Sequence, residues 1–138
     1  MTTWTSDELK KVGNAEELKI RSLRGDGTLR KPVTIWVVRL EDDLFVRAVN
    51  GQSSAWFRGT QVRREGHISA GGVEKDVIFL EETDPGINEQ IDSVYRSKYQ
   101  RYAANIVNSV LTPQARGATL KLVPRSRGSY TAITTGFC

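Results

Sequence analysis

The run over residues 33–40 constrains the fold of this chain most, because it is strongly β-prone and apolar on both faces. In an extended strand, successive side chains point to opposite faces. The two faces are Val33, Ile35, Val37 and Arg39 on one side, and Thr34, Trp36, Val38 and Leu40 on the other. A strand that is buried on both sides is typical of a barrel interior. We therefore expect other strands to surround it.

Further strand patterns occur along the chain, separated by turn residues. They cover residues 18–23, 44–49, 66–70, 73–80 and 119–123. Gly71 and Gly72 suit a tight hairpin turn between the third and fourth of these, and Asn50-Gly51 permits the left-handed backbone that ends the second. With the central run, this makes about six mostly antiparallel strands. The sequence predicts a small α+β barrel.

Helix signals lie in both halves of the chain. Thr5 and Glu8 form a capping box, and Trp4 is placed to pack across it as an anchor. Asp84 and Pro85 begin the longest predicted helix, whose apolar stripe continues to Ile106. Short helices are expected over residues 53–59 and 112–116. One long helix and short flanking helices therefore accompany the barrel.

A length of 138 residues suits one domain, which we expect to span residues 1–125. The Arg, Ser, Gly and Thr residues of 126–138 predict a loosely ordered tail. Cys138 is the sole cysteine and there is one histidine, so neither a disulfide framework nor a metal site is expected. No apolar run approaches the roughly 20 residues of a membrane helix, and no signal peptide is evident, so the expected location is the cytoplasm.

A basic excess is concentrated around the central strand. Residues 21–64 contain nine Lys or Arg side chains against four acidic ones, whereas the remaining residues contain eleven against twelve. Arginine dominates the nine, and its planar guanidinium suits phosphate and carboxylate groups. Exposed aromatic residues suited to base stacking are not evident among these cations. We expect a small anionic ligand rather than nucleic acid.

Two segments are candidates for holding that anion. The turn over residues 25–32 delivers Arg30 and Lys31 to the start of the central strand, although a Gly-Asp-Gly sequence also suits a plain turn. Ser53 and Ser54 precede a helical turn whose amides would favour an anion. The alternative is that Ser53 is only an N-cap and that Trp56 belongs to the core.

The order of these segments resembles the flavin-binding split barrels. The residues that carry the resemblance are Lys31-Pro32-x-Thr34, the strand ending at Asn50-Gly51, Ala55-Trp56-Phe57 and the hairpin through Gly71-Gly72. The pattern is most similar to the deazaflavin-dependent nitroreductase-like branch. The whole chain resembles an uncharacterised bacterial family of that superfamily, to which the Trp36 to Arg39 and Tyr95 to Tyr99 segments are typical.

The resemblance implies a split β-barrel that binds FMN or a deazaflavin and acts as an oxidoreductase on a small anionic or aromatic substrate. The cofactor-binding residues that it implies are Arg30, Lys31, Thr34, Trp36, Asn50, Gly51, Ser53, Ser54 and Trp56. It also implies a homodimer that builds the site between subunits.

Two other functions fit the same residues. One is a cofactor-independent cavity enzyme of the isomerase, cyclase or lyase type, in which Arg47, His67 or Tyr95 acts as the acid or base. His67 is equally compatible with a surface or packing role. The other is a non-catalytic module that binds an anionic ligand.

Overall fold

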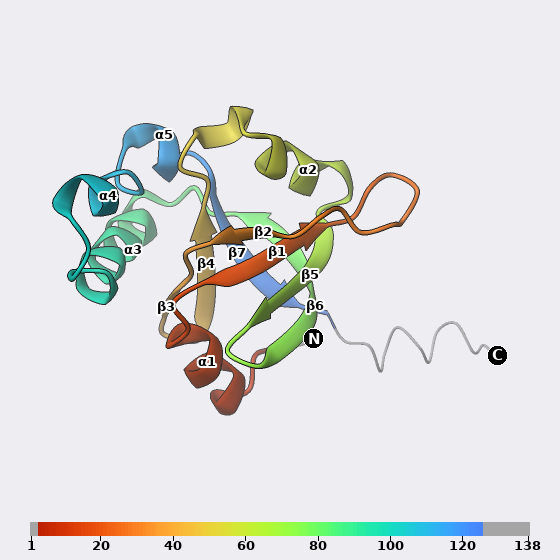
Figure 1. Cartoon of the computed structure of the whole chain (residues 1–138), viewed down its shortest axis with the longest axis horizontal. Helices are drawn as coiled ribbons and strands as arrows, with labels where there is room; N and C mark the ends of the chain where they lie inside the picture. Colours follow the sequence, from red (N-terminus) through yellow and green to blue (C-terminus); the bar gives the residue numbers. More distant parts are fainter. Residues whose placement is uncertain (1–2, 126–138) are drawn as a thin grey trace.

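The computed structural model describes residues 3–125 and has an α+β fold, a curled antiparallel sheet flanked by helices (Figure 1). The predicted tail over 126–138, with Cys138, lies outside the described residues. The strands are β1 (Leu18–Ser22), β2 (Val33–Ile35), β3 (Val38–Leu40), β4 (Asp43–Arg47), β5 (Glu65–Ala70), β6 (Val73–Glu81) and β7 (Thr119–Pro124). The helices are α1 (Ser6–Gly13), the 3-10 turn η1 (Gly51–Ser53), α2 (Ala55–Arg63), α3 (Pro85–Lys98), α4 (Ala104–Asn108) and α5 (Pro113–Arg116).

The sheet closes on itself because its two edge strands are consecutive in the chain. Within the described residues, the strand order is β2-β1-β5-β6-β7-β4-β3, with every pair antiparallel. Only Trp36 and Val37 separate Ile35, the end of β2, from Val38, the start of β3. Three Cα steps span at most about 11 Å, so the two edges must lie close together. The result is the split barrel that the sequence predicts, with seven strands rather than about six.

The prediction of one continuous strand over residues 33–40 is wrong, since the chain leaves the sheet at Trp36 and Val37. Side chains from the end of α3 bind the backbone of Val37 at this point. Tyr99 Oη lies 3.3 Å from the Val37 amide, and Lys98 Nζ donates to the Val37 carbonyl at 2.6 Å. The backbone polar groups are therefore satisfied outside the ladder, which allows the chain to pass from one edge to the other.

Two hydrophobic cores follow from the two apolar faces of this region. The larger fills the barrel and includes Val37, Val46 and Phe79. The smaller lies between the outside of β3–β4 and α3, where Val38 and Phe45 meet α3. Trp36 packs against the smaller core and Val37 is buried in the larger one. The predicted two-sided burial is thus confirmed, although the strand is interrupted.

The two helix starts predicted from capping residues, those of α1 and α3, are confirmed. Thr5 and Glu8 form the capping box of α1, and the Trp4 indole N–H donates to the Leu122 carbonyl at 2.9 Å. Asp84 caps α3 through the Ile87 amide. Trp4 is therefore a packing anchor, as expected.

Two helix lengths differ from prediction. The long helix ends at Lys98 instead of continuing to Ile106, which lies in the separate α4 and is exposed. Helix α2 has nine residues where a single turn was expected. In the part of the chain that the structure describes, no helix is both long and apolar enough to cross a membrane.

Candidate functional site

A pocket of about 290 Å³ lies where the β1–β2 turn meets α2. Figure 1 shows this turn extending beside α2, at the end of the molecule opposite α1. The lining of the pocket combines three cations with hydroxyl and apolar groups: Arg24, Arg30, Lys31, Ser22, Thr60, Ile20, Val33, Ala55 and Trp56. No acidic side chain belongs to this lining. The pocket is therefore suited to a ligand with one anionic end and one apolar part.

Internal hydrogen bonds order the turn that carries these cations. The Asp26 carboxylate accepts from the Thr28 amide at 3.0 Å and from the Thr28 hydroxyl at 2.7 Å. These bonds to Thr28 hold the pKa of Asp26 below its usual value. Arg24 donates to Thr28 Oγ1 and to the Leu29 carbonyl. The Gly-Asp-Gly segment therefore forms a turn, which Asp26 closes through Thr28, and the same turn also presents Arg30 and Lys31 to the pocket.

The backbone of Arg30 is hydrogen-bonded on both sides, while its side-chain Nε has no hydrogen-bond partner among residues 3–125. Its amide donates to the Ser22 carbonyl at 2.9 Å, and its carbonyl accepts from Arg21 Nε at 2.8 Å. Arg30 Nε is buried without a hydrogen-bond acceptor among the described residues. A buried donor left in this state costs about 1–3 kcal/mol. Arg30 is therefore the group in this pocket with the most to gain from an anionic ligand.

Gly59 makes room for Arg30 against α2. A Cβ atom at this position would lie 2.8 Å from Ser22 Oγ and 2.9 Å from Arg30 Nε. Both distances are shorter than a non-bonded carbon contact allows. Gly59 is thus required for the observed position of Arg30, although the sequence pattern alone drew no attention to it.

The start of α2 forms another part of the pocket through Ala55 and Trp56. The N-cap is Ser54, so the alternative in which Ser53 is the N-cap is wrong. Ser54 makes no side-chain cap bond to the helix amides, because its hydroxyl donates to the Gly51 carbonyl at 3.0 Å. The Ser53 hydroxyl likewise bonds the Asn50 carbonyl. The first amides of α2 are therefore not capped by a side chain, and helix amides of this kind favour an anion.

Only some of the predicted cofactor-binding residues line the pocket. Arg30, Lys31 and Trp56 line the pocket together. Thr34 is exposed on β2, and its neighbour Val33 lines the pocket instead. The segment of Asn50, Gly51, Ser53 and Ser54 leads into α2 without lining the pocket.

Trp36 belongs to an aromatic cluster at the end of α3. It stacks on Tyr99 with ring centroids 3.8 Å apart and planes inclined by 3°, and Tyr102 lies beside both rings. Trp36 therefore helps to join α3 to the barrel and does not line the pocket.

Arg47 lies in a buried polar network beneath α3. Its side chain has no exposed surface and pairs with Asp92, which is 1% exposed and also pairs with Arg116. Its remaining donors bond Thr119 Oγ1, the Val110 carbonyl, and both the carbonyl and the side chain of Asn88. These bonds join β4 to α3, β7 and the segment after α4.

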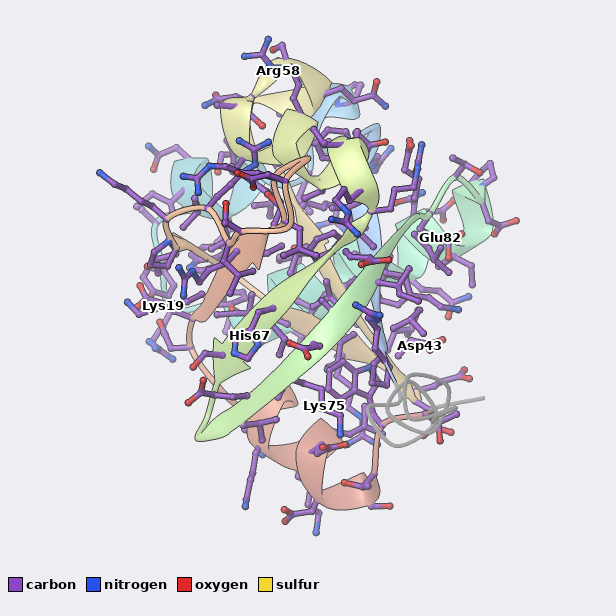
Figure 2. The ribbon with its side chains drawn as sticks, turned by 90° about the vertical axis from the view of Figure 1, so that its right-hand side faces the viewer. Lys19, Asp43, Arg58, His67, Lys75 and Glu82 are labelled. Atoms are coloured by element: carbon purple, nitrogen blue, oxygen red, sulfur yellow. The ribbon has the colours of Figure 1, made fainter. Side chains whose placement is uncertain are left out.

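Tyr95 and His67 lie on different elements, and neither lines the pocket. Tyr95 is fully buried in the smaller core, and burial raises the pKa of its phenol well above the usual value. His67 lies on β5, where Nδ1 is 3.0 Å from Asp76 Oδ1 and Nε2 is 3.1 Å from Glu74 Oε1 (Figure 2). Of the three predicted acid–base residues, Arg47 and Tyr95 lie together, with the Arg47 guanidinium carbon 5.4 Å from the centre of the Tyr95 ring, whereas His67 lies on β5.

A family model described as an uncharacterized protein conserved in bacteria, DUF2255, matches residues 8–122. This range covers most of the chain. The chain belongs to the DUF2255 family. A search of the curated proteins finds no significant match.

Several solved structures have the same fold as this DUF2255 chain, although their sequence identity to it is low. A conserved hypothetical protein from Mycobacterium tuberculosis has a TM-score of 0.65 at 9% identity, covering 89% of this chain and 82% of its own. An FAD-binding protein from Mesorhizobium loti has a TM-score of 0.56 at 14% identity, covering 91% and 93%. An F420 reductase has a TM-score of 0.54 at 12% identity, covering 86% and 93%. At these identities the likeness shows the split-barrel fold alone.

Proposed function

We propose that this DUF2255 protein binds the phosphate end of a flavin-type cofactor, FMN or a deazaflavin, in the α2 pocket. The observation that carries the proposal is the buried Arg30 Nε without a partner, which lies among cations in a pocket that no carboxylate lines. A phosphate would supply the missing acceptor and would be bound through charge-assisted hydrogen bonds. The FAD-binding and F420 reductase neighbours have this fold, which supports the class of cofactor.

The residues of the pocket would divide the work of binding. Arg30 and Lys31 would hold the phosphate, with Arg24 at the edge of the turn. Trp56, Ile20 and Val33 offer apolar surface to the ring system and exclude water from it. When bound, a flavin or deazaflavin supplies hydride transfer, and the protein supplies binding and orientation. This would be an oxidoreductase acting on a small anionic or aromatic substrate.

The size of the pocket also bears on assembly. A volume of about 290 Å³ lies at the small end of ligand sites. The ring system of a bound cofactor would therefore extend beyond the pocket. We propose that a second copy of the chain covers it, as in a homodimer, which sedimentation equilibrium with and without cofactor would test.

The first experiment is a cofactor titration with matched variants. The wild-type protein is expected to gain thermal stability with FMN or a deazaflavin, and Arg30→Gln and Lys31→Gln should remove that gain. Arg58→Gln and Lys19→Gln are suitable controls, because both cations are exposed and neither lines the pocket. A colourless protein that neither cofactor stabilises would overturn the proposal.

The small pocket volume favours one alternative, a site for a small anionic metabolite without a cofactor. The two functions differ in their ligands. Stabilisation by small phosphate esters that depends on Arg30, without any stabilisation by FMN or a deazaflavin, would select the alternative.

A further inference from the structure

A second cleft, of about 420 Å³, lies between α1, β3 and α3. The side chains that line it are Leu9, Lys10, Gly13, Asn14, Arg39, Ser93, Val94, Ser97 and Lys98. It shares no residue with the α2 pocket. Three cations and three uncharged hydrogen-bonding groups therefore line the cleft, and no carboxylate does.

Lys98 is the most deeply placed of the three cations. Its ammonium group donates to the Val37 carbonyl at 2.6 Å and lies 5.2 Å from the centre of the Tyr99 ring. Burial lowers the pKa of Lys98 to about 8, against an opposing effect from Glu16. Arg39 and Lys10 add positive charge from β3 and α1. An anion in the cleft would offset the cost of keeping Lys98 charged.

Acidic groups near the cleft compensate part of its charge. Asp7 pairs with Lys11, and Glu16 pairs with Arg101 through Oε1, while Glu16 Oε2 is buried without a hydrogen-bond partner among the described residues. Asp42 is 4.0 Å from Arg39, the limit of an ion pair, and is 92% exposed. Lys10 has no ion-pair partner among residues 3–125. The positive charge of the cleft is thus only partly compensated.

The close approach of α1 to β3 gives the cleft a defined wall. A Cβ atom on Gly13 would lie 3.1 Å from Arg39 Cβ and 3.3 Å from Arg39 Cδ. The end of α1 therefore rests directly on the stem of Arg39. Arg39 Nε also donates to the Glu41 carbonyl at 2.6 Å. These contacts hold the stem and the Nε of Arg39 in place at this wall of the cleft.

We propose that the cleft between α1, β3 and α3 is a second ligand site, which binds a small, multiply charged oxyanion. A volume of about 420 Å³ is within the range of small-molecule sites. The three cations match a ligand with two or three negative charges, and Asn14, Ser93 and Ser97 can hydrogen-bond its remaining oxygens. Phosphate esters and polycarboxylates share this chemistry. The proposal does not depend on the function of the α2 pocket.

The test is isothermal titration of the full chain with pyrophosphate and, separately, with citrate. The Arg30→Gln/Lys31→Gln protein is used, so that anion binding in the α2 pocket does not contribute. We expect one site per chain, weakened roughly tenfold or more by Lys98→Met, since a charge-assisted bond is lost. Arg39→Gln and Lys10→Gln should also weaken it. Lys11→Gln is the matched control, because Lys11 neighbours Lys10 without lining the cleft.

Proton uptake separates a binding role of Lys98 from a structural one. At pH 8 the amine is close to its pKa, so bound anion should draw in a fraction of a proton, visible when titrations in two buffers of different ionisation enthalpy are compared. Lys98→Met should abolish this uptake. Tighter binding of pyrophosphate would indicate a phosphate ester, and tighter binding of citrate a polycarboxylate. Absence of binding by both, or affinity unchanged in Arg39→Gln and Lys10→Gln, would overturn the proposal.

Discussion

Two arginines illustrate how differently this molecule uses a guanidinium group. Arg47 is fully buried, and its donors are bound by Asp92, Thr119, Val110 and Asn88. Arg30 is only half-buried, yet its Nε is enclosed without an acceptor in the part of the chain that the structure describes. The first arrangement has nothing left to offer a ligand. The second leaves one strong donor unused beside a pocket, which is the mark of a binding group.

The surroundings of the two residues differ in the same way. Arg47 joins four segments and faces the carboxylate of Asp92, so its charge is neutralised within the fold. Arg30 projects from a turn beside Lys31, and no carboxylate lines the pocket that it enters. Because the charge of Arg47 is compensated inside the fold, we infer that Arg47 stabilises the fold. We propose ligand binding as the role of Arg30, because the charge of its side chain is not compensated by a carboxylate in the lining of the pocket.

The largest expected effect is on folding, through Arg47→Met. This change removes Arg47 from its buried ion pair with Asp92 and leaves the Val110 carbonyl without its Arg47 donor, and breaking a buried pair of this kind costs about 3–5 kcal/mol. Urea denaturation should show this loss in the free energy of unfolding. Arg58→Met, at an exposed position on α2, should change it by about 0.5 kcal/mol or less. A loss below about 1 kcal/mol for Arg47→Met would refute the role assigned to the network.

Arg30→Gln should lower ligand affinity without lowering the stability of the fold. Removing the unsatisfied donor should leave the free energy of unfolding unchanged or slightly higher, while ligand affinity falls by roughly ten- to a hundredfold. Denaturation and cofactor titration of one protein sample measure both quantities. A variant that unfolds as easily as Arg47→Met would show that the two arginines do not differ in role.

Gly59→Ala tests the position of Arg30 without removing it. The new Cβ would displace Arg30 and Ser22, so affinity should fall by a few-fold to tenfold. Helix stability should gain at most about 1 kcal/mol from alanine, which partly offsets the crowding. The same change made in the Arg30→Gln protein should have little further effect on affinity. Equal losses in both backgrounds would mean that Gly59 does not act through Arg30.

A separate effect is the dependence of stability on pH through Lys98. Its pKa in the folded protein is about 8, below the value of about 10.4 for an unfolded chain. Between these values the unfolded state binds more protons, so stability should rise with pH. The free energy of unfolding of the wild type, relative to Lys98→Met, should therefore increase from pH 8 to pH 10. A difference that stays constant over this range would show that Lys98 is not desolvated.

Local signals in the sequence were enough to predict several elements. The capping box at Thr5, the hairpin through Gly71-Gly72 and the start of α3 at Asp84 depend on neighbouring residues only, and all are confirmed. The clustering of cations in the β1–β2 turn was also visible locally. This is why Arg30 and Lys31 were predicted as a pair and lie together in the pocket.

The missed features depend on contacts between distant residues. The break in the central strand at Val37 is caused by Lys98 and Tyr99, about 60 positions further along the chain. The saturation of Arg47 likewise requires Asn88, Asp92 and Thr119. A period of two or 3.6 residues carries no information about such partners. The importance of Gly59 could be recognised only from the structure, because it depends on how closely the Arg30 side chain approaches α2.

The most direct test compares a phosphate-bearing cofactor with its phosphate-free analogue. FMN and riboflavin, and the corresponding deazaflavin pair, are titrated into the wild type, Arg30→Gln and Arg58→Gln. If Arg30 holds the phosphate, the wild type and Arg58→Gln should bind the phosphate form at least roughly tenfold more tightly, and Arg30→Gln, which keeps Lys31, should lose most of this preference. The same preference in all three proteins, or no binding of either pair, would contradict the assignment of the α2 pocket as the cofactor site.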